Sequence, residues 1–335
     1  MMHKSSSLNV GVLGATGYAG RELIRLLAAH PRTEIRFATS ESEAGARLRL
    51  IARNAPDLTL VRSEDAPLGE VDVVFSCLPH GASIPWVERA RNAGARVIDL
   101  SSDLRVPNES TPDWGRAAVY GMPELHREQI RGAELIANPG CYPTGATLGI
   151  APLVRRGLVG GSSPVIINAA SGATGAGRSP KREYLFAEVG EDFRAYAVGN
   201  VHRHLAEIQH QVGLLAPDDA PDLVFTPHLL PVRRGILETI YVPLAREVGS
   251  EEALAMYEED YGDEPFVDVL REGTPKLSDV VGTNRLEISV VQVEGVEQPM
   301  MTVLAAEDNL VKGASGQALQ NLNVMEGWPE TEGLT

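Results

Sequence analysis

The feature that most constrains this chain is a glycine-rich turn near its start, between an apolar run and a helical pattern. Residues Leu8–Leu13 are typical of a short buried strand, and Tyr18–His30 carries apolar side chains at helical spacing. The spacing Gly14-x-x-Gly17-x-x-Gly20 permits a tight turn and a close approach of backbone to a pyrophosphate at the helix N-terminus. This pattern predicts a nucleotide-binding unit; the alternative is a strand–helix turn without a ligand.

Strands and helices alternate through the rest of the first half. Val71–Leu78 is an apolar run, Ile84–Ala93 has a helical pattern, and Ala95–Leu100 is another strand candidate. This alternation of strands and helices predicts a parallel sheet with helices on both faces. The second half has β-branched strands with fewer helices between them, which indicates a mixed or antiparallel sheet. A length of 335 residues fits two domains.

The charge and cysteine content exclude several classes of function. Lys plus Arg is 30 and Asp plus Glu is 45, so the net charge of -15 disfavours nucleic acid and anionic membranes as partners. An anionic substrate would need a local cluster of cations or backbone N–H groups. Two cysteines outside any CxxC pattern argue against disulfides and zinc fingers. The sequence shows no secretory leader or membrane span, so a cytoplasmic enzyme is expected.

The residues at the end of the second strand bear on the choice of dinucleotide. NAD-binding proteins usually place Asp or Glu there to hold the ribose hydroxyl. This chain has Thr39 and Ser40, whose hydroxyls can accept a 2′-phosphate without charge repulsion, which favours NADP. Glu41 and Glu43 follow immediately and weaken the argument, whereas Arg47 could supply a cation.

A second turn carries the candidate nucleophile. Asn138, Pro139 and Gly140 form a turn ahead of Cys141, and the following residues can continue as a helix. A cysteine at a helix N-terminus has its thiolate stabilised by the helix dipole, and the same N–H groups can hold an oxyanion, together with the Asn138 side chain. The alternative is a buried structural cysteine, which is the interpretation we give to Cys77.

Histidines in the second half are candidates for proton transfer. His202 and His204 begin a helical run, and Glu207 lies three residues after His204, where it could orient the imidazole. We expect His204 to be the proton donor with His202 near the nicotinamide, although the pattern does not separate the two. A zinc site and a solvated helix start are the alternatives.

Two further segments could bind anions. Arg105 follows a parallel strand at the edge where ligands gather, and a guanidinium can clamp phosphate or carboxylate. The glycine-rich run Ser171–Arg178 could offer backbone N–H groups to phosphate. A surface ion pair and a flexible loop are the respective alternatives.

Taken together, these segments resemble the N-acetyl-γ-glutamyl-phosphate reductases of arginine biosynthesis over nearly the whole chain. The aspartate-semialdehyde dehydrogenases share the architecture and the cysteine chemistry, but their glutamine-containing cysteine signature does not match. Reductases of carrier-bound aminoadipyl phosphate depart from the Asn-Pro-Gly-Cys-Tyr-Pro-Thr run that this chain keeps. The segments that carry the resemblance are 14–20, 78–81, 99–105, 138–145, 171–178, 202–204, 234–236 and 308–313.

The resemblance implies an α/β fold: a Rossmann NADP-binding domain formed by residues 1–142 plus 309–335, with an inserted α+β mixed-sheet domain, residues 143–308, for catalysis and oligomerisation. It also implies a dimer or tetramer and NADPH-dependent reduction of an acyl phosphate through a Cys141 thioester. No metal is expected, because no carboxylate or cysteine completes an obvious ligand set with the histidines. The alternatives are a reductase of a related acyl phosphate, a non-catalytic NADP-binding regulator and a metal-dependent hydrolase. The implied cofactor-binding residues are Gly14, Thr16, Gly17, Tyr18, Ala19, Gly20, Thr39, Ser40, Pro79, His80, Gly172 and Asn309. The implied substrate-binding residues are Arg105, Ser171 and Arg178.

Overall fold

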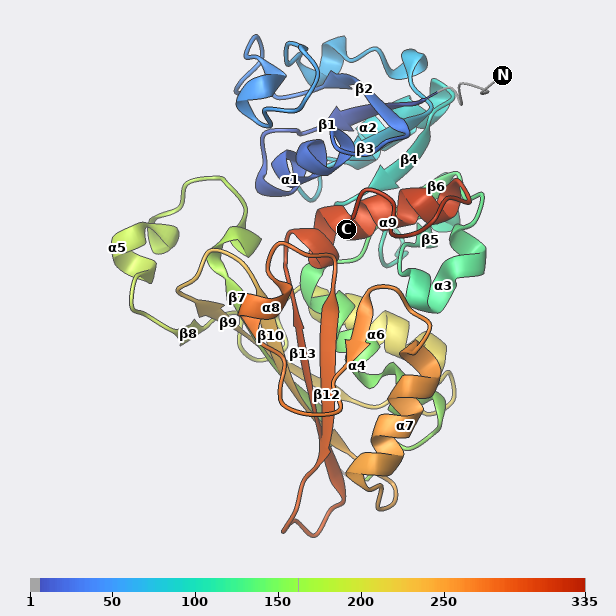
Figure 1. The fold of residues 1–335 in the computed structure, drawn as a ribbon, viewed down its shortest axis with the longest axis vertical. Coiled ribbons are helices and arrows are strands. Elements are labelled where there is room, and N and C mark those ends of the chain that lie inside the picture. The colour runs from blue at the N-terminus through green and yellow to red at the C-terminus, as the bar shows by residue number, and fades with distance from the viewer. Residues whose placement is uncertain (1–6, 162, 335) are drawn as a thin grey trace. The chain divides into compact units, whose positions relative to one another are not determined.

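The computed structural model describes residues 7–161 and 163–334, which fall into two compact units (Figure 1). The first unit comprises Met1–Pro139 and Ala314–Thr335, and the second comprises Gly140–Gly313. The sequence predicts boundaries after residues 142 and 308, and the units change after residues 139 and 313. The second unit is therefore an insertion in the chain of the first.

The first unit is built on a six-stranded sheet in the order β2-β1-β3-β4-β6-β5, in which every pairing is parallel. Its strands are β1 (Leu8–Leu13), β2 (Thr33–Ala38), β3 (Val73–Ser76), β4 (Arg96–Asp99), β5 (Val119–Tyr120) and β6 (Leu135–Ala137). Its α-helices are α1 (Tyr18–Leu27), α2 (Ile84–Asn92), α3 (Pro123–Ile130) and α9 (Gly316–Met325).

Two hydrophobic cores lie on opposite faces of this sheet because strand side chains alternate. Val10 and Val12 of β1 pack in one core with Leu23 of α1 and Leu319 of α9. Leu13 belongs to the other core, with residues of α2. Helices on both faces of a parallel sheet confirm the predicted Rossmann architecture.

The second unit is built on a seven-stranded mixed sheet in the order β11-β12-β13-β10-β7-β9-β8. Its strands are β7 (Val165–Gly172), β8 (Arg194–Ala195), β9 (Leu223–Leu230), β10 (Ile236–Pro243), β11 (Val267–Val269), β12 (Leu286–Gln292) and β13 (Met300–Glu307). Its helices are α4 (Cys141–Arg155), α5 (Phe186–Val189), α6 (His204–Leu215), α7 (Ser250–Tyr261) and α8 (Leu277–Val280). The mixed sheet confirms the predicted α+β character of this part.

Helices cover one face of the second sheet. Helix α4 packs on β10 and β13, α6 packs on β9, and α7 packs on β11 and β12. Along β10 the side chains on this face are buried, whereas Leu237, Thr239 and Tyr241 on the other face are partly exposed. No helix in residues 7–161 and 163–334 is long and apolar enough to span a lipid bilayer.

Candidate active site

The glycine turn between β1 and α1 has the shape of a phosphate cradle. Gly14 adopts φ +76°, and a Cβ there would lie 2.7 Å from Cys77 O. A Cβ on Gly20 would overlap Gly14 O and would lie 2.9 Å from Ala15 C. A Cβ on Gly17 would meet nothing closer than Gly14 O at 3.7 Å, and Gly17 begins α1 without a side-chain cap. The protein itself therefore leaves space at Gly17, where an anion can meet the helix N-terminus.

Hydroxyl groups at the end of β2 fix this turn. Thr39 Oγ1 accepts a hydrogen bond of 3.1 Å from Gly14 N, and the Ser40 and Thr16 hydroxyls are 2.9 Å apart. All three residues are buried. Among the acidic neighbours, Glu41 accepts a hydrogen bond from Ser63 N, which holds the pKa of its carboxyl below the usual range.

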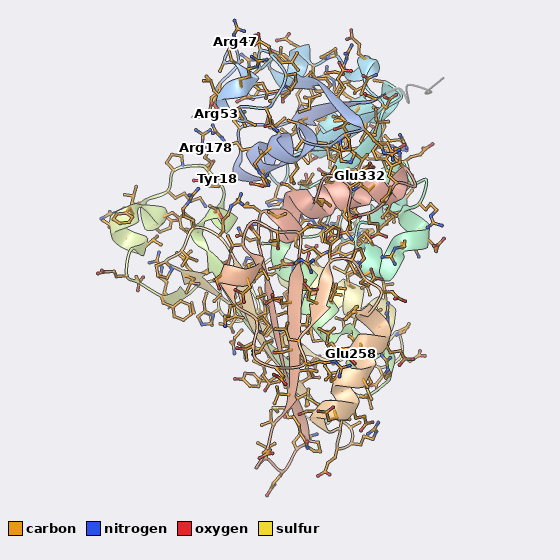
Figure 2. All side chains as sticks on the ribbon, viewed as in Figure 1. Tyr18, Arg47, Arg53, Arg178, Glu258 and Glu332 are labelled. Atoms are coloured by element: carbon orange, nitrogen blue, oxygen red, sulfur yellow. The ribbon has the colours of Figure 1, made fainter. Side chains whose placement is uncertain are left out.

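Other predicted residues of the first unit lie beyond the ends of its strands. Tyr18 starts α1 and is exposed (Figure 2), and the adjacent Ala19 O accepts a hydrogen bond from Ser315 Oγ. Pro79 and His80 are in the loop after β3, where His80 Nδ1 accepts a hydrogen bond from Ser102 N.

Two residues predicted to contact substrate make hydrogen bonds within the first unit. Arg105 is buried, and its guanidinium donates to Leu100 O at 2.7 Å. Asn138 is fully buried; its Nδ2 donates to Ala314 O at 3.1 Å and its Oδ1 accepts from Asn321 Nδ2 at 3.0 Å. The Asn138 side chain thus links the end of β6 to the C-terminal segment, and its contact with an oxyanion stays a prediction.

In the second unit, Cys141 is the first residue of α4, as the sequence predicts, and it is partly exposed. No side chain caps this helix. Gly140 N donates to Glu207 Oε1 at 2.8 Å, Thr144 N donates to Gly140 O at 3.2 Å, and Pro143 has no N–H group. The predicted oxyanion contacts therefore fall on the N–H groups of Cys141 and Tyr142.

The other cysteine has a contrasting environment in the first unit. Cys77 follows β3, and burial, with a smaller contribution from Asp99, raises the pKa of its thiol. A thiol that resists ionisation is a poor nucleophile. This agrees with the structural interpretation of Cys77.

Cys141 opens into a cavity of about 140 Å³ within the second unit. Both candidate histidines and the predicted Ser171 and Gly172 line it with Cys141. Two cations, Lys181 and Arg203, also line it, and none of the described lining residues is Asp or Glu. In a chain of net charge -15, this cavity is locally suited to an anionic ligand.

The two histidines differ in their surroundings. Their ring centroids are 4.9 Å apart, and His204 is buried whereas His202 is half-buried. His202 Nδ1 accepts a hydrogen bond from His204 N, so the neutral ring carries its proton on Nε2. Burial, followed by the charge of Arg203, lowers the pKa of His202 to about 4. His202 is therefore neutral near pH 7 and can donate a hydrogen bond there through Nε2.

The lowered pKa of His202 predicts a pH-dependent effect on stability. The folded state takes up a proton at His202 near pH 4 and the unfolded chain near 6.5, so acidification through this window costs stability. The variant His202→Gln should lose less Tm than the wild type between pH 7 and pH 5, by on the order of 2 °C. Differential scanning calorimetry measures this, with His210→Gln in α6 as control. Parallel Tm curves for wild type and His202→Gln would contradict the assignment.

Several lining residues were not predicted. Tyr142 Oη and Tyr196 Oη are 2.9 Å apart, burial raises the pKa of Tyr142, and burial raises the pKa of Tyr196 to about 12. Both phenols therefore stay protonated and can donate hydrogen bonds. Tyr142 follows the candidate nucleophile Cys141, and Arg203 separates the two histidines, so proximity in sequence could have found them. Nothing in the pattern points to Lys181, Tyr184 or Tyr196.

The remaining predicted residues of the second unit are not among those that line the cavity. Glu207 is buried and bonded to Gly140 N. Arg178 is exposed (Figure 2). Asn309 is buried; its Oδ1 accepts from Gly235 N at 2.9 Å and its Nδ2 donates to Thr174 Oγ1 at 3.0 Å. Their catalytic and binding roles stay predictions.

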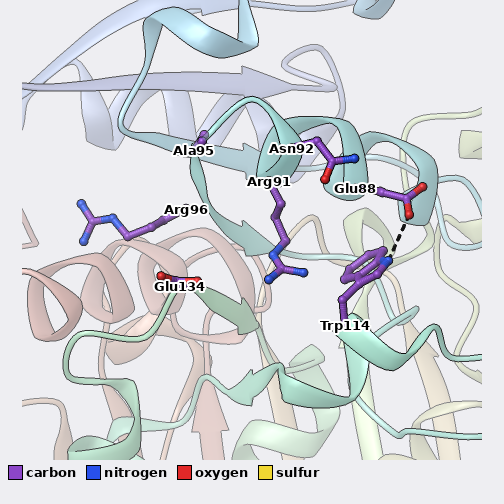
Figure 3. Close-up of a pocket in the computed structure, with 8 residues that line it drawn as sticks. Glu88, Arg91, Asn92, Ala95, Arg96, Trp114 and Glu134 are labelled. Carbon is purple, nitrogen blue, oxygen red and sulfur yellow. Dashed lines mark hydrogen bonds between the residues drawn. The ribbon is translucent and has the colours of Figure 1, made fainter.

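A larger cavity of about 340 Å³ lies in the first unit (Figure 3). Arg96, the first residue of β4, lines it. The cavity therefore lies at the amino ends of the parallel strands, whereas the glycine turn follows the carboxyl end of β1. Trp114 Nε1 donates to Glu88 Oε1 at 3.2 Å there. None of the predicted site residues lines it. In the described ranges, no group of three His, Cys, Asp or Glu side chains is placed to hold a metal ion.

Comparisons with known proteins agree with this geometry. Residues 9–133 match the family model "Semialdehyde dehydrogenase, NAD binding domain", and residues 141–309 match "Semialdehyde dehydrogenase, dimerisation domain". N-acetyl-γ-glutamyl-phosphate reductases of Geobacter sp. (strain M21) and Desulfotalea psychrophila are each 44% identical to this chain, covering 98% of both sequences. The chain belongs to the N-acetyl-γ-glutamyl-phosphate reductase family. The predicted family is thereby confirmed.

The fold of this N-acetyl-γ-glutamyl-phosphate reductase family member is similar to that of solved aspartate semialdehyde dehydrogenases. Aspartate semialdehyde dehydrogenase II of Vibrio cholerae, complexed with ASA, aligns with TM-score 0.74 at 19% identity, covering 96% of this chain and 98% of that one. The Candida albicans enzyme with NADP aligns with TM-score 0.70 at 17% identity, covering 95% and 98%. At these identities the likeness concerns the fold.

Proposed function

We propose that this protein reduces N-acetyl-γ-glutamyl phosphate to N-acetylglutamate semialdehyde with NADPH, releasing phosphate. The observation that carries the proposal is Cys141 at the uncapped start of α4, in a cavity with two histidines and two cations. Relatives that are 44% identical to this chain carry the name of this reaction. A helix start stabilises a thiolate, and the cations suit an acyl phosphate.

The glycine turn fits a dinucleotide. The space at Gly17 and the uncapped N-terminus of α1 suit a pyrophosphate. Thr39 and Ser40, rather than a carboxylate, follow the end of β2. The neighbouring Glu41 accepts a hydrogen bond from Ser63 N through Oε1. Both features favour NADP. When bound, NADPH supplies the hydride that reduces the acyl group.

The chain's own residues perform the other steps. The Cys141 thiolate attacks the acyl carbonyl, and backbone N–H groups at the start of α4 stabilise the oxyanion. Lys181 and Arg203 neutralise the departing phosphate. After reduction of the thioester, a histidine of the pair takes the proton from the hemithioacetal hydroxyl, the carbon–sulfur bond breaks, and the electron pair returns to the Cys141 sulfur as the aldehyde leaves. Tyr142 and Tyr196, which line the cavity, donate hydrogen bonds to oxygen atoms of the substrate.

The reverse reaction tests the proposal directly. Purified protein is supplied with NADP, inorganic phosphate and one semialdehyde at a time: N-acetylglutamate, aspartate or aminoadipate semialdehyde. NADPH absorbance reports turnover. We expect kcat/KM for N-acetylglutamate semialdehyde to exceed the others by about 100-fold or more. A higher kcat/KM for another semialdehyde would assign the chain to that substrate, and no turnover with any would overturn the enzymatic function.

We further propose that the protein works in the cytoplasm as a homo-oligomer. Support comes from the description of residues 141–309 as a dimerisation domain and from the uncovered face of its sheet. That face carries partly exposed apolar residues, including Ile166, Leu237 and Leu304. The variant Leu237→Asp should convert the oligomer to monomers in analytical ultracentrifugation, whereas Leu50→Asp, an exposed site in the first unit, should not. An unchanged sedimentation coefficient for Leu237→Asp would contradict this interface.

A further inference from the structure

Two glutamates are buried on the helix-covered face of the second sheet. Glu238 lies in the middle of β10 and Glu307 ends β13, and neither side chain is exposed. Glu238 pairs in register with Ala305, and Ile236 pairs with Glu307. Because side chains two residues apart share a face, the two carboxyls are diagonal neighbours on one side of the sheet.

No cation of the described ranges 7–161 and 163–334 forms an ion pair with Glu238. Within the described residues neither of its carboxyl oxygens has a hydrogen-bond partner. Burial and the charge of Glu307 raise the pKa of Glu238 well above its ordinary value. An ionised carboxylate in such a place would be very costly, so this environment favours the protonated form of Glu238.

Two glycines give these carboxyls their space beneath α4. A Cβ on Gly145 would lie 2.8 Å from Glu238 Oε2. A Cβ on Gly313 would lie 3.0 Å from Glu307 Oε1 and 2.8 Å from Cys141 Cβ. Gly145 lies inside α4, where glycine lowers helix stability by about 1 kcal/mol relative to alanine. The space for the Glu238 carboxyl therefore reduces the stability of this helix. Glu307 and Cys141 are therefore near neighbours across Gly313.

We propose that Glu238 and Glu307 share one proton, and that the charge remaining on Glu307 sets the pH at which Cys141 becomes a nucleophile. Two buried carboxyls on paired strands do not both ionise readily, and the pKa of Glu238 is the one that burial and the neighbouring charge raise. Lys312, which precedes Gly313, is also fully buried. A negative charge beside Cys141 opposes thiolate formation and offsets part of the dipole of α4.

Other charged groups around the start of α4 define the background for this effect. They are Glu207 and His204 on α6, Lys312 after β13, and the cavity-lining Lys181, His202, Arg203, Tyr142 and Tyr196. None of them is changed in the variants below. Glu307 is thus inferred to be a positioning residue that acts through Cys141, which rests on the proposed function of that thiol.

The test measures the rate of Cys141 alkylation by iodoacetamide against pH, in a Cys77→Ser background. We expect Glu307→Gln to lower the midpoint of the profile by about one pH unit, so that alkylation near pH 6 is about ten-fold faster. The conservative variant Glu307→Asp, which keeps the charge, should restore the wild-type midpoint. Glu238→Gln, which mimics a protonated acid, should leave the midpoint in place.

Stability against pH provides a second measurement that does not involve Cys141. The folded pKa of Glu238 is raised, so the wild type loses stability as pH rises from about 4.5 towards that pKa. Glu238→Gln does not titrate, and its Tm advantage over the wild type should grow between pH 5 and pH 8. Glu247→Gln, at an exposed site of the same unit, should follow the wild type.

These outcomes separate the inference from the proposed function. An unchanged alkylation midpoint in a folded Glu307→Gln, or an equal shift in Glu238→Gln, would overturn the shared proton as the control of Cys141. Should Glu307→Gln not fold, a constant Tm difference between Glu238→Gln and wild type across pH would overturn it instead. Alkylation requires no substrate, so a failed reductase assay leaves these measurements intact.

Discussion

Replacement of Cys141 by serine should abolish reductase turnover while leaving NADP binding intact. A serine hydroxyl at the start of α4 does not ionise near neutral pH, so the covalent thioester cannot form at a useful rate. Removal of a nucleophile of this kind costs about 10⁴-fold or more in kcat. The side chain is partly exposed, so the change should leave the fold unaffected.

The measurement is kcat in the reverse assay, alongside the NADP dissociation constant from fluorescence titration. Cys77→Ser is the matched control, because Cys77 lies in the first unit outside the cavity. It should retain turnover within about two-fold. Activity of Cys141→Ser within ten-fold of the wild type would contradict covalent catalysis. Equal losses in both variants would indicate a general effect on folding.

Replacement of Gly20 by alanine should disrupt the dinucleotide-binding turn. The added Cβ would overlap Gly14 O and approach Ala15 C to 2.9 Å, and both are backbone atoms that cannot rotate away. Overpacking against backbone costs about 1–3 kcal/mol and displaces the turn. We expect a lower Tm together with a loss of NADP affinity of about 100-fold, because the N–H groups of α1 no longer converge on the pyrophosphate.

Two further glycine variants separate stability from binding. Gly17→Ala has room for its Cβ within the protein, so it should keep the wild-type Tm and still weaken NADP binding by about ten-fold, where the methyl group displaces the ligand. Gly213→Ala in α6 meets no atom within 4 Å and should be neutral or up to about 1 kcal/mol more stable. Calorimetry gives the Tm and NADP titration gives the affinity of the Gly20→Ala, Gly17→Ala and Gly213→Ala variants. A wild-type NADP affinity in Gly17→Ala would contradict the proposal that the pyrophosphate binds at this turn.

Local patterns in the sequence predicted much of the fold. The apolar run Leu8–Leu13 predicts a strand, and β1 has these bounds in the structure. The start of α4 was marked by the turn before Cys141 and by Pro143. In each case a short-range rule determines the conformation, because turn residues and periodicity act on neighbours in the chain.

The tertiary features of the site could not be predicted in this way. Lys181 and Tyr196 reach the cavity from segments without a hydrophobic period, so their positions depend on packing of the whole unit. Glu238 interrupts the apolar alternation of β10 on its buried face, where the pattern assigns an acid to the solvent side. Its burial depends on the space left by Gly145, far away in the sequence.

The hydrogen bond between Gly140 N and Glu207 has a mechanical consequence. It ties the beginning of the helix that carries the sulfur to the helix that begins at His204. Thermal displacement of either helix therefore carries the other along, and the spacing between imidazole and sulfur is preserved during turnover. Shortening this tether in Glu207→Asp would let the reacting groups drift apart, which reduces the frequency of productive encounters without weakening substrate capture.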